Sequence, residues 1–145
     1  MKEKDEFIRQ FREIQPKFSR FYARLLTEAS VSLPQFALLS QLAVEGPLSM
    51  TGVGRKLHVT KPAVTHLVDR LEKNGFLRRQ AHPKDRRIFL LEIHPKGEKL
   101  VRKVQSEALR LVLETLKEFT AKEKETLVRF YTLLSQMLDG VLAKR

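Results

Sequence analysis

The stretch TKPAVTHLVDRLEK, residues 60–73, combines hydrogen-bonding side chains with positive charge. Its apolar residues recur at spacings of three and four, which is typical of a helix with one buried face. Small side chains allow close approach to a partner, and cations bind phosphate groups. The alternative interpretation is a solvated helix face, on which Arg70 and Lys73 could pair with Asp69 or Glu72. The outer face has small polar groups near its start and cations further along: Lys61, Pro62, Thr65, His66, Arg70 and Lys73.

The positive charge of the chain is concentrated around this stretch. The 145 residues include 28 basic and 17 acidic side chains, a net charge of +11. Residues 55–103 account for +9 of this excess, and the segments on either side contribute +1 each. A localised basic excess of this kind is typical of a protein that binds a polyanion such as nucleic acid.

The chain lacks the groups on which several other kinds of chemistry depend. It has no cysteine, which excludes thiol nucleophiles, disulfides and cysteine-based zinc sites. Its four histidines do not have the spacing of metal ligands, and the sequence has no glycine-rich phosphate loop and no clustered Ser/His/Asp set. We therefore expect no enzyme activity, no cofactor and no metal.

Composition indicates a globular protein, with 42% apolar and 31% charged residues. No apolar run approaches the roughly 20 residues that span a bilayer, and the N-terminus lacks the apolar stretch of a signal peptide. We expect a single-domain, cytoplasmic protein with no membrane partner.

Two helices are expected before the basic stretch. Apolar residues keep helical spacing from Asp5 to Ala29, although Pro16 should kink or divide this helix because it removes a backbone donor. Ser32 and Gln35 have the spacing of a capping box that starts the second helix.

The following residues predict a helix-turn-helix. Ser49 caps a short helix that ends near Leu57, His58 takes a left-handed turn conformation, and Thr60 caps the basic helix. In such a motif the second helix packs on the first and directs its outer N-terminal residues into the major groove of DNA. The small groups of residues 60–73 would then lie beside base edges, and the cations beside phosphates.

Residues 77–94 favour a β-hairpin, because two extended runs flank the turn sequence His82-Pro83-Lys84-Asp85. The tip is basic, with Arg86 and Arg87 following Lys84. This hairpin would form a wing beside the helix-turn-helix. A charged tip that only prevents aggregation is the alternative, and we favour contact with the minor groove.

Long helices complete the chain, the last of them starting at a capping box formed by Thr120 and Glu123. The predicted fold class is mainly α (α+β): a winged helix-turn-helix with N- and C-terminal helices forming a dimerisation layer. Residues 1–30 and 95–145 would form that layer, and residues 32–94 the DNA-binding lobe. The apolar stripes of the terminal helices are too wide for a monomer to bury, so we expect a homodimer. The predicted seam comprises Leu134, Leu138 and Val141, with Phe7 and Phe11 from the partner.

The chain resembles the MarR family of winged-helix transcriptional regulators over essentially its full length. The matching stretches are LPQFALLSQL, LHVTKPAVTHLVDRLEKNGFLRR and HPKDRRIFLLEIHPKG. The resemblance implies a homodimer that binds double-stranded DNA at a palindromic operator. It also implies a repressor, as is usual in the family, that is released by a small anionic or aromatic ligand.

The resemblance assigns roles to individual residues. Arg87 matches the arginine of the family's wing that enters the minor groove, and Asp85 matches the acid that orients it. Phe18 and Tyr22 lie near the family's ligand cleft, although core or dimer packing is the alternative for them. Taken with the patterns above, the expected DNA contacts are Ser49, Thr60, Lys61, Pro62, Thr65, His66, Arg70, Lys73, Lys84, Asp85, Arg86 and Arg87.

The chain departs from the family pattern in three places. Gly52 and Gly54 replace the usual Glu and Ala, which predicts a looser supporting helix. His66 stands where Arg is common, which predicts a different operator preference. His94 replaces the usual Thr, which predicts a weaker cap on the helix that follows.

Two other functions are compatible with the same sequence. One is a weakly specific, nucleoid-type DNA-binding protein of this fold, which competitor DNA would distinguish from a specific regulator. The other is a module that binds only proteins. Retained DNA binding in an Arg87→Ala variant would favour this alternative.

Overall fold

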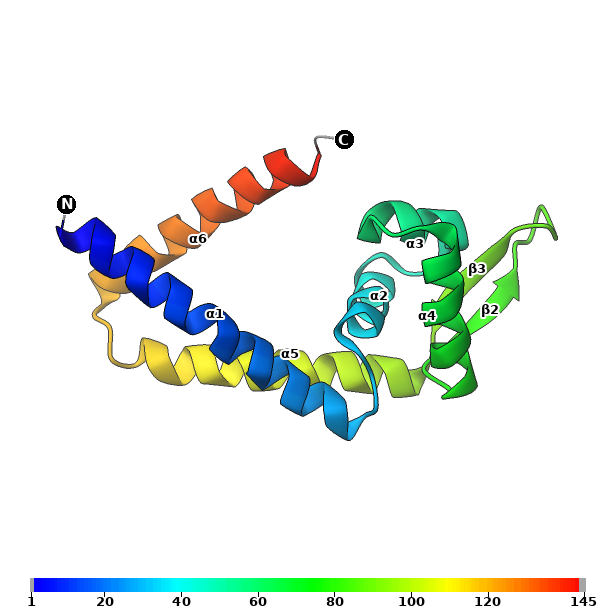
Figure 1. Ribbon diagram of the computed structural model, residues 1–145, viewed down its shortest axis with the longest axis horizontal. Coiled ribbons are helices and arrows are strands. Elements are labelled where there is room, and N and C mark those ends of the chain that lie inside the picture. The colour runs from blue at the N-terminus through cyan, green and yellow to red at the C-terminus, as the bar shows by residue number, and fades with distance from the viewer. Residues whose placement is uncertain (1, 144–145) are drawn as a thin grey trace. The chain divides into compact units, whose positions relative to one another are not determined.

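The structure is a computed structural model that describes residues 2–143 (Figure 1). The chain divides into two compact units, residues up to Gln105 and residues from Ser106 onward, and α5 runs from the first into the second. The elements in chain order are α1 (Lys2–Glu28), α2 (Leu33–Glu45), β1 (Leu48–Ser49), α3 (Met50–Leu57), α4 (Lys61–Lys73), β2 (Leu77–Ala81), β3 (Phe89–Ile93), α5 (Pro95–Leu116) and α6 (Ala121–Leu142).

The first helix is continuous, so the expectation that Pro16 divides it was wrong. Pro16 has no N–H to donate to the carbonyl of Arg12, one turn earlier. Both residues are exposed, so water can satisfy that carbonyl. The apolar face of α1 then continues across the proline without interruption.

The predicted N-caps are confirmed at four helices, including α3, where Ser49 accepts a hydrogen bond from the backbone N–H of Gly52. Ser32 and Gln35 exchange both hydrogen bonds of a capping box at α2, and Thr120 and Glu123 do the same at α6. Thr60 caps α4 by accepting a hydrogen bond from the backbone N–H of Ala63. At α6 the hydrogen bonds that Thr120 donates lower the pKa of the Glu123 carboxyl.

The helix-turn-helix is formed by α3 and α4, as predicted. His58 ends α3 in the left-handed region, with φ 53° and ψ 42°. Gly54 allows the close packing of the two helices, because a Cβ at that position would lie 3.2 Å from the carbonyl oxygen of Val59 and 3.3 Å from Cγ2 of Val64. The helix α3 is regular from Met50 to Leu57, so the two glycines do not interrupt it.

A three-stranded antiparallel sheet completes this lobe, with strand order β1-β3-β2. The hairpin of β2 and β3 was predicted, and its register pairs Leu77 with Ile93 and Ala81 with Phe89. The strand β1 was not predicted, because two residues are too few to show a period. It pairs Leu48 with Leu91 and so ties the start of α3 to the wing.

One apolar core holds the helix-turn-helix, the sheet and the start of α5 together. Its fully buried side chains include Leu38 and Leu42 of α2 and Leu91 of β3, each no more than 1% exposed. The inner stripe of α4 is buried as predicted, with Val64, Val68 and Leu71 among the core residues. Burial on this face leaves the opposite face of α4 exposed to solvent.

Gly97 is required where α5 passes the end of β3. A Cβ there would lie 2.4 Å from the backbone oxygen of Phe76 and 2.8 Å from Cγ1 of Ile93. We expect Gly97→Ala to lower the free energy of unfolding by about 3 kcal/mol, because backbone atoms must move to make room. Urea denaturation measures this change.

Gly140 provides the matched control, since a Cβ at that position of α6 meets nothing within 4 Å. Gly140→Ala should leave stability unchanged or raise it by up to about 1 kcal/mol through helix propensity. Equal effects of the two substitutions would contradict the packing explanation.

The second unit consists of the C-terminal half of α5 and the helix α6. Its apolar side chains are mostly exposed, and none of the α6 residues is buried. Among residues 2–143, no helix is both long and apolar enough to cross a membrane.

Candidate nucleic-acid interface

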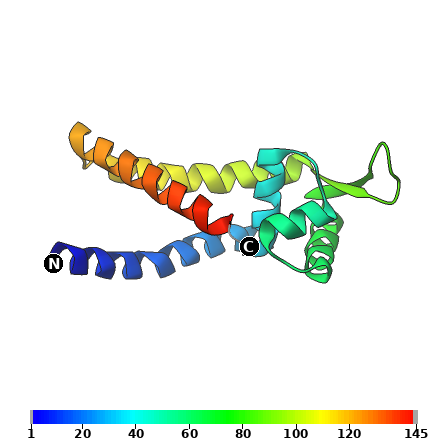
Figure 2. The same ribbon diagram turned by 90° about the horizontal axis from the view of Figure 1, so that it is seen from above.

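The exposed face of α4 has the residues that the sequence analysis predicted there. Lys61 and Pro62 form its first turn, and Thr65 and His66 follow one turn later. All four side chains are exposed. The helix lies beside the hairpin of β2 and β3 at one end of the first unit (Figure 2). The arrangement matches the one in which a second helix enters a groove and a wing contacts the flanking DNA.

Thr65 has a defined hydrogen-bonding state on this face. Its hydroxyl donates to the carbonyl oxygen of Lys61 at 3.1 Å. The hydroxyl hydrogen is therefore used within the helix, and the oxygen lone pairs and the methyl group remain available to a ligand.

The acidic residues of α4 are neutralised by an arginine of the wing. The guanidinium of Arg79, on β2, forms an ion pair with Asp69 and another with Glu72, the latter at 2.9 Å. The backbone N–H of Arg79 also donates to Glu72 at 2.9 Å. These bonds raise the pKa of Arg79, chiefly through the hydrogen bond to Asp69. Arg79 therefore fixes the wing to α4, the predicted recognition helix.

This arrangement contradicts the alternative interpretation in which the acids of α4 pair with basic residues of the same helix. Asp69 and Glu72 were considered as partners of Arg70 and Lys73 along the helix, and the structure pairs them with Arg79 instead. Sequence reasoning missed Arg79, because the acids lie seven and ten residues before it and come together with it only when β2 packs beside α4. The six basic side chains on α4 and the wing loop therefore have no ion-pair partner within residues 2–143: Lys61, Arg70, Lys73, Lys84, Arg86 and Arg87.

Replacing Arg79 with methionine should weaken both the fold and DNA binding. We expect the free energy of unfolding to fall by about 1–2 kcal/mol, since two carboxylates lose a half-buried partner. The same unpaired carboxylates would repel phosphates and lower DNA affinity. The neighbouring Arg78 is the control, because its side chain is exposed and, among residues 2–143, pairs only with Glu92 at 2.7 Å. Urea denaturation measures both variants. If Arg78→Met lowered the free energy of unfolding as much as Arg79→Met does, this role of Arg79 would be contradicted.

The loop of the wing runs from His82 to Ile88 and is ordered by side-chain bonds to its own backbone. Asp85 accepts a hydrogen bond from the backbone N–H of Arg87 at 3.0 Å, and Nδ1 of His82 accepts one from Lys84 at 3.1 Å. Asp85 was predicted to orient Arg87; the structure bonds it to the backbone of that residue, and its effect on the Arg87 side chain stays a prediction. The three basic side chains of this loop are exposed.

Ser49 and Thr60 lie at the N-termini of the two helices of the motif. Ser49 accepts a hydrogen bond from the backbone N–H of Gly52 at 2.9 Å, and Thr60 accepts one from Ala63 at 3.4 Å. Each hydroxyl keeps its own hydrogen, which it can donate to a phosphate oxygen.

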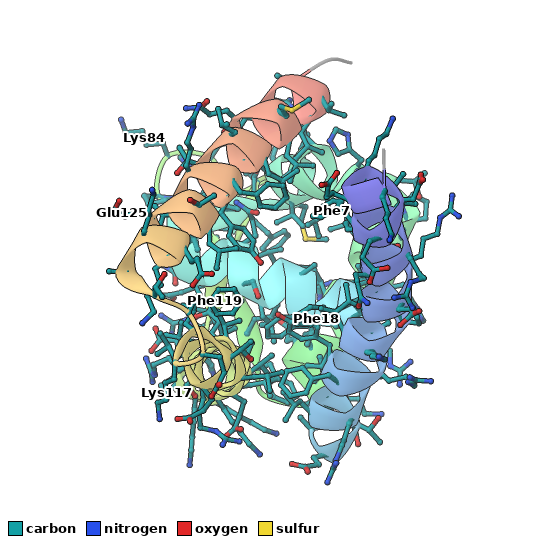
Figure 3. All side chains as sticks on the ribbon, turned by 90° about the vertical axis from the view of Figure 1, so that its left-hand side faces the viewer. Phe7, Phe18, Lys84, Lys117, Phe119 and Glu125 are labelled. Atoms are coloured by element: carbon teal, nitrogen blue, oxygen red, sulfur yellow. The ribbon has the colours of Figure 1, made fainter. Side chains whose placement is uncertain are left out.

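Of the two residues predicted to bind a ligand, the structure places only one beside a cavity at the end of α1. Tyr22 lines this cavity, of about 240 Å³, between α1 and the start of α2, together with Leu26 and Val31. Phe18 is not among the residues that line it. In Figure 3, Phe18 lies on the same side of α1 as Phe7. Within residues 2–143, no group of three or more His, Asp or Glu side chains could hold a metal ion.

These features define a winged helix-turn-helix protein of the DNA-binding class. Similar proteins agree with this assignment. The MarR family model matches residues 31–89. The regulator YfiV of Bacillus subtilis, described as an uncharacterized HTH-type transcriptional regulator, is 26% identical over 130 residues, which cover 82% of this chain and 81% of YfiV.

Two solved structures extend the similarity over nearly the whole chain. The transcriptional regulator BldR from Sulfolobus solfataricus is 32% identical, with a TM-score of 0.61 over 92% of this chain and 96% of BldR. A MarR family protein from Bacillus stearothermophilus is 25% identical, with a TM-score of 0.82 over 95% of this chain and 96% of that protein. The chain belongs to the MarR family of helix-turn-helix transcriptional regulators. Regulators of this family bind DNA and act as dimers.

Proposed function

We propose that the protein is a homodimeric repressor that binds a palindromic operator and is released by a small molecule. The observation that carries this proposal is the distribution of charge on the lobe. The acids of α4 are both paired with Arg79, while the cations of α4 and the wing loop have no partner within residues 2–143. An unpaired cationic face of this kind complements a phosphate backbone.

The first turns of α4 would read bases in the major groove. Thr65 can present its methyl group to a thymine methyl and its oxygen to an amino group of adenine or cytosine, since its hydrogen is bonded to Lys61. His66 is exposed beside it and can donate or accept. Arg70 and Lys73, further along α4, would bind phosphates at the edge of the groove.

The wing loop would reach the flanking minor groove. Arg86 and Arg87 are exposed, and the bonds of Asp85 and His82 to the loop backbone limit the conformations that the loop must lose on binding. Arginine side chains are favoured in narrow minor grooves, where the negative potential is strongest.

A second copy of the chain would cover the apolar faces of the terminal helices. Monomeric proteins rarely expose large contiguous apolar patches. The α6 side chains Met137 and Val141 are 72% and 65% exposed, and Phe7 and Phe11 near the start of α1 are 55% and 50% exposed. The two faces would pair across a two-fold axis, as dimers of this kind do.

The cavity beside Tyr22 is the place where we expect an effector of the predicted class to bind. It is lined mainly by apolar groups and lies next to Ser32, the cap of α2. A ligand there would change how α1 meets α2 and so the spacing of the two lobes in the dimer. Loss of Tyr22 should then reduce the response to the effector more than it reduces DNA affinity.

The test of DNA recognition is selection of bound fragments from fragmented genomic DNA, followed by competition at fixed salt. A specific regulator should prefer its selected site over random DNA by roughly 10³ or more. A preference of only a few fold would support the alternative, a weakly specific nucleoid-type protein. No binding to either DNA would contradict the proposal.

His66→Ala and Arg87→Ala should fail in different ways. Loss of Arg87 should weaken binding to many sequences and reduce the slope of log affinity against log salt by about one phosphate equivalent. Loss of His66 should change discrimination at one base step by roughly 1–3 kcal/mol. Fluorescence anisotropy with the operator and with random DNA measures both. Equal losses of His66→Ala on the two DNAs would contradict base reading by this residue.

A further inference from the structure

A second cavity, of about 420 Å³, lies where the end of α1, the start of α5 and the residue before β2 meet. All of its lining residues belong to the first compact unit. It is separate from the cavity beside Tyr22, since the two share no lining residue. The lining consists of four apolar residues, one acid and three lysines: Leu25, Ala29, Phe76, Leu100, Glu28, Lys96, Lys99 and Lys103.

The lysines place an excess of positive charge on one side of the cavity. Lys96, Lys99 and Lys103 are spaced by three and four residues on α5, so they are neighbours on one helix face and repel one another. Glu28 is the only acid of the lining, and it pairs with Lys103 at 3.0 Å. The ammonium of Lys99 has no hydrogen-bond or ion-pair partner within residues 2–143. The lining therefore has a net charge of +2 beside apolar surface.

One of these lysines is bonded to the end of the recognition helix. Nζ of Lys96 donates to the carbonyl oxygen of Asn74, the C-cap of α4, at 2.7 Å. The same ammonium lies 4.4 Å from the centroid of the Phe76 ring. A cation at the C-terminus of a helix stabilises its last turn. An anion that bound Lys96 would compete with Asn74 for that ammonium.

Phe76 joins the cavity to the rest of the lobe. Its backbone N–H donates to Leu71 of α4 at 2.9 Å, and its carbonyl accepts from the N–H of His94, just before α5, at 2.9 Å. The recognition helix, the first strand of the wing and α5 thus meet at one lining residue. A ligand in the cavity would touch this junction without touching the DNA-contacting side chains.

We propose that this cavity binds an organic phosphate monoester with a small apolar body, and that binding lowers DNA affinity by drawing Lys96 away from the end of α4. A phosphate monoester carries a charge of about −1.5 to −2 at neutral pH, which matches the net charge of the lining, whereas a monocarboxylate would balance only half of it. Lysines bind phosphate as point charges, and the apolar residues accept the carbon body. The effect on DNA rests on the proposed function, and the binding site does not.

Phenyl phosphate is a suitable probe, titrated into the full-length protein by calorimetry in the absence of DNA. We expect one site per chain, and binding about tenfold or more weaker in Lys99→Gln, which removes a charge-assisted bond. The matched control is Lys124→Gln on α6, an exposed lysine outside the cavity, which should bind as the unaltered protein does. Benzoate should bind more weakly than phenyl phosphate, and phenol more weakly still.

Equal affinity of the unaltered protein and Lys99→Gln would overturn the site, and equal affinity for benzoate and phenyl phosphate would overturn the preference for a dianion. The coupling is tested with the selected operator. Phenyl phosphate should weaken DNA binding several-fold in the unaltered protein, and about ten times the concentration or more should be needed for the same effect in Lys99→Gln. Unchanged DNA affinity with the cavity filled would overturn the coupling. If the protein bound no DNA at all, the proposed function would fail while the titration without DNA still decided the site.

Discussion

Replacing Leu138 with glutamate is expected to convert the protein to a monomer and to reduce DNA binding to the non-specific level. Leu138 is 51% exposed on α6, a helix with no buried residue. The apolar side chains of this helix can therefore be removed from solvent only if a second copy of the chain covers them. A carboxylate buried in the seam of each copy would lose its hydration, and we expect that cost to outweigh the remaining apolar contacts. One lobe alone makes half of the contacts, and we expect an affinity loss of roughly 10³.

Gln136→Glu is the matched control for this substitution. It adds the same charge to the same helix two residues away, and that spacing places it on a different face of α6. Light scattering at micromolar concentration should give a dimer mass for Gln136→Glu and a monomer mass for Leu138→Glu. A dimer mass for Leu138→Glu would show that α6 does not form the seam.

Local sequence chemistry predicted the elements of this fold because the signals for their ends are short-range. A cap needs a side chain three residues from a free N–H, so Ser32, Thr60 and Thr120 could be identified without knowledge of the rest of the molecule. The left-handed His58 was predicted for the same reason, since the conformation belongs to a single residue. The inner stripe of α4 followed from its period.

Features that depend on tertiary packing were missed. Arg79 reaches the acids of α4 only because β2 folds back beside that helix, and nothing in the spacing of the residues distinguishes it from Arg78. The strand β1 exists only because β3 is present to pair with it. The contact of Lys96 with Asn74 joins residues that are 22 positions apart. Each of these is a pairing between elements, for which a single sequence has no local signal.

The assignment of individual side chains to bases and phosphates stays a prediction. The residues that the sequence identified on α4 and in the wing loop are exposed and lie on one lobe, which is a necessary condition for the predicted contacts. The six without ion-pair partners within residues 2–143 satisfy a second condition, since a cation already paired would lose that pair on binding a phosphate.

The spacing of the two half-sites gives the other prediction with a large effect. Two α4 helices related by a two-fold axis can enter successive major grooves only if their separation matches one turn of DNA, about 34 Å or 10 base pairs. An insertion of five base pairs, half a turn, between the half-sites places them on opposite faces of the duplex. We expect this insertion to lower affinity by roughly 10³, to the level of random DNA.

An insertion of ten base pairs serves as the control because it returns the half-sites to the same face at twice the separation. It should restore part of the affinity only if the dimer can stretch or the DNA can bend. The fraction of affinity that is restored therefore measures how rigidly the terminal helices set the distance between the lobes. Fluorescence anisotropy with the three duplexes at one salt concentration provides the comparison. If the five-base-pair insertion left the affinity undiminished, the two lobes could not be binding as a symmetric pair, and each α4 would have to recognise its half-site independently.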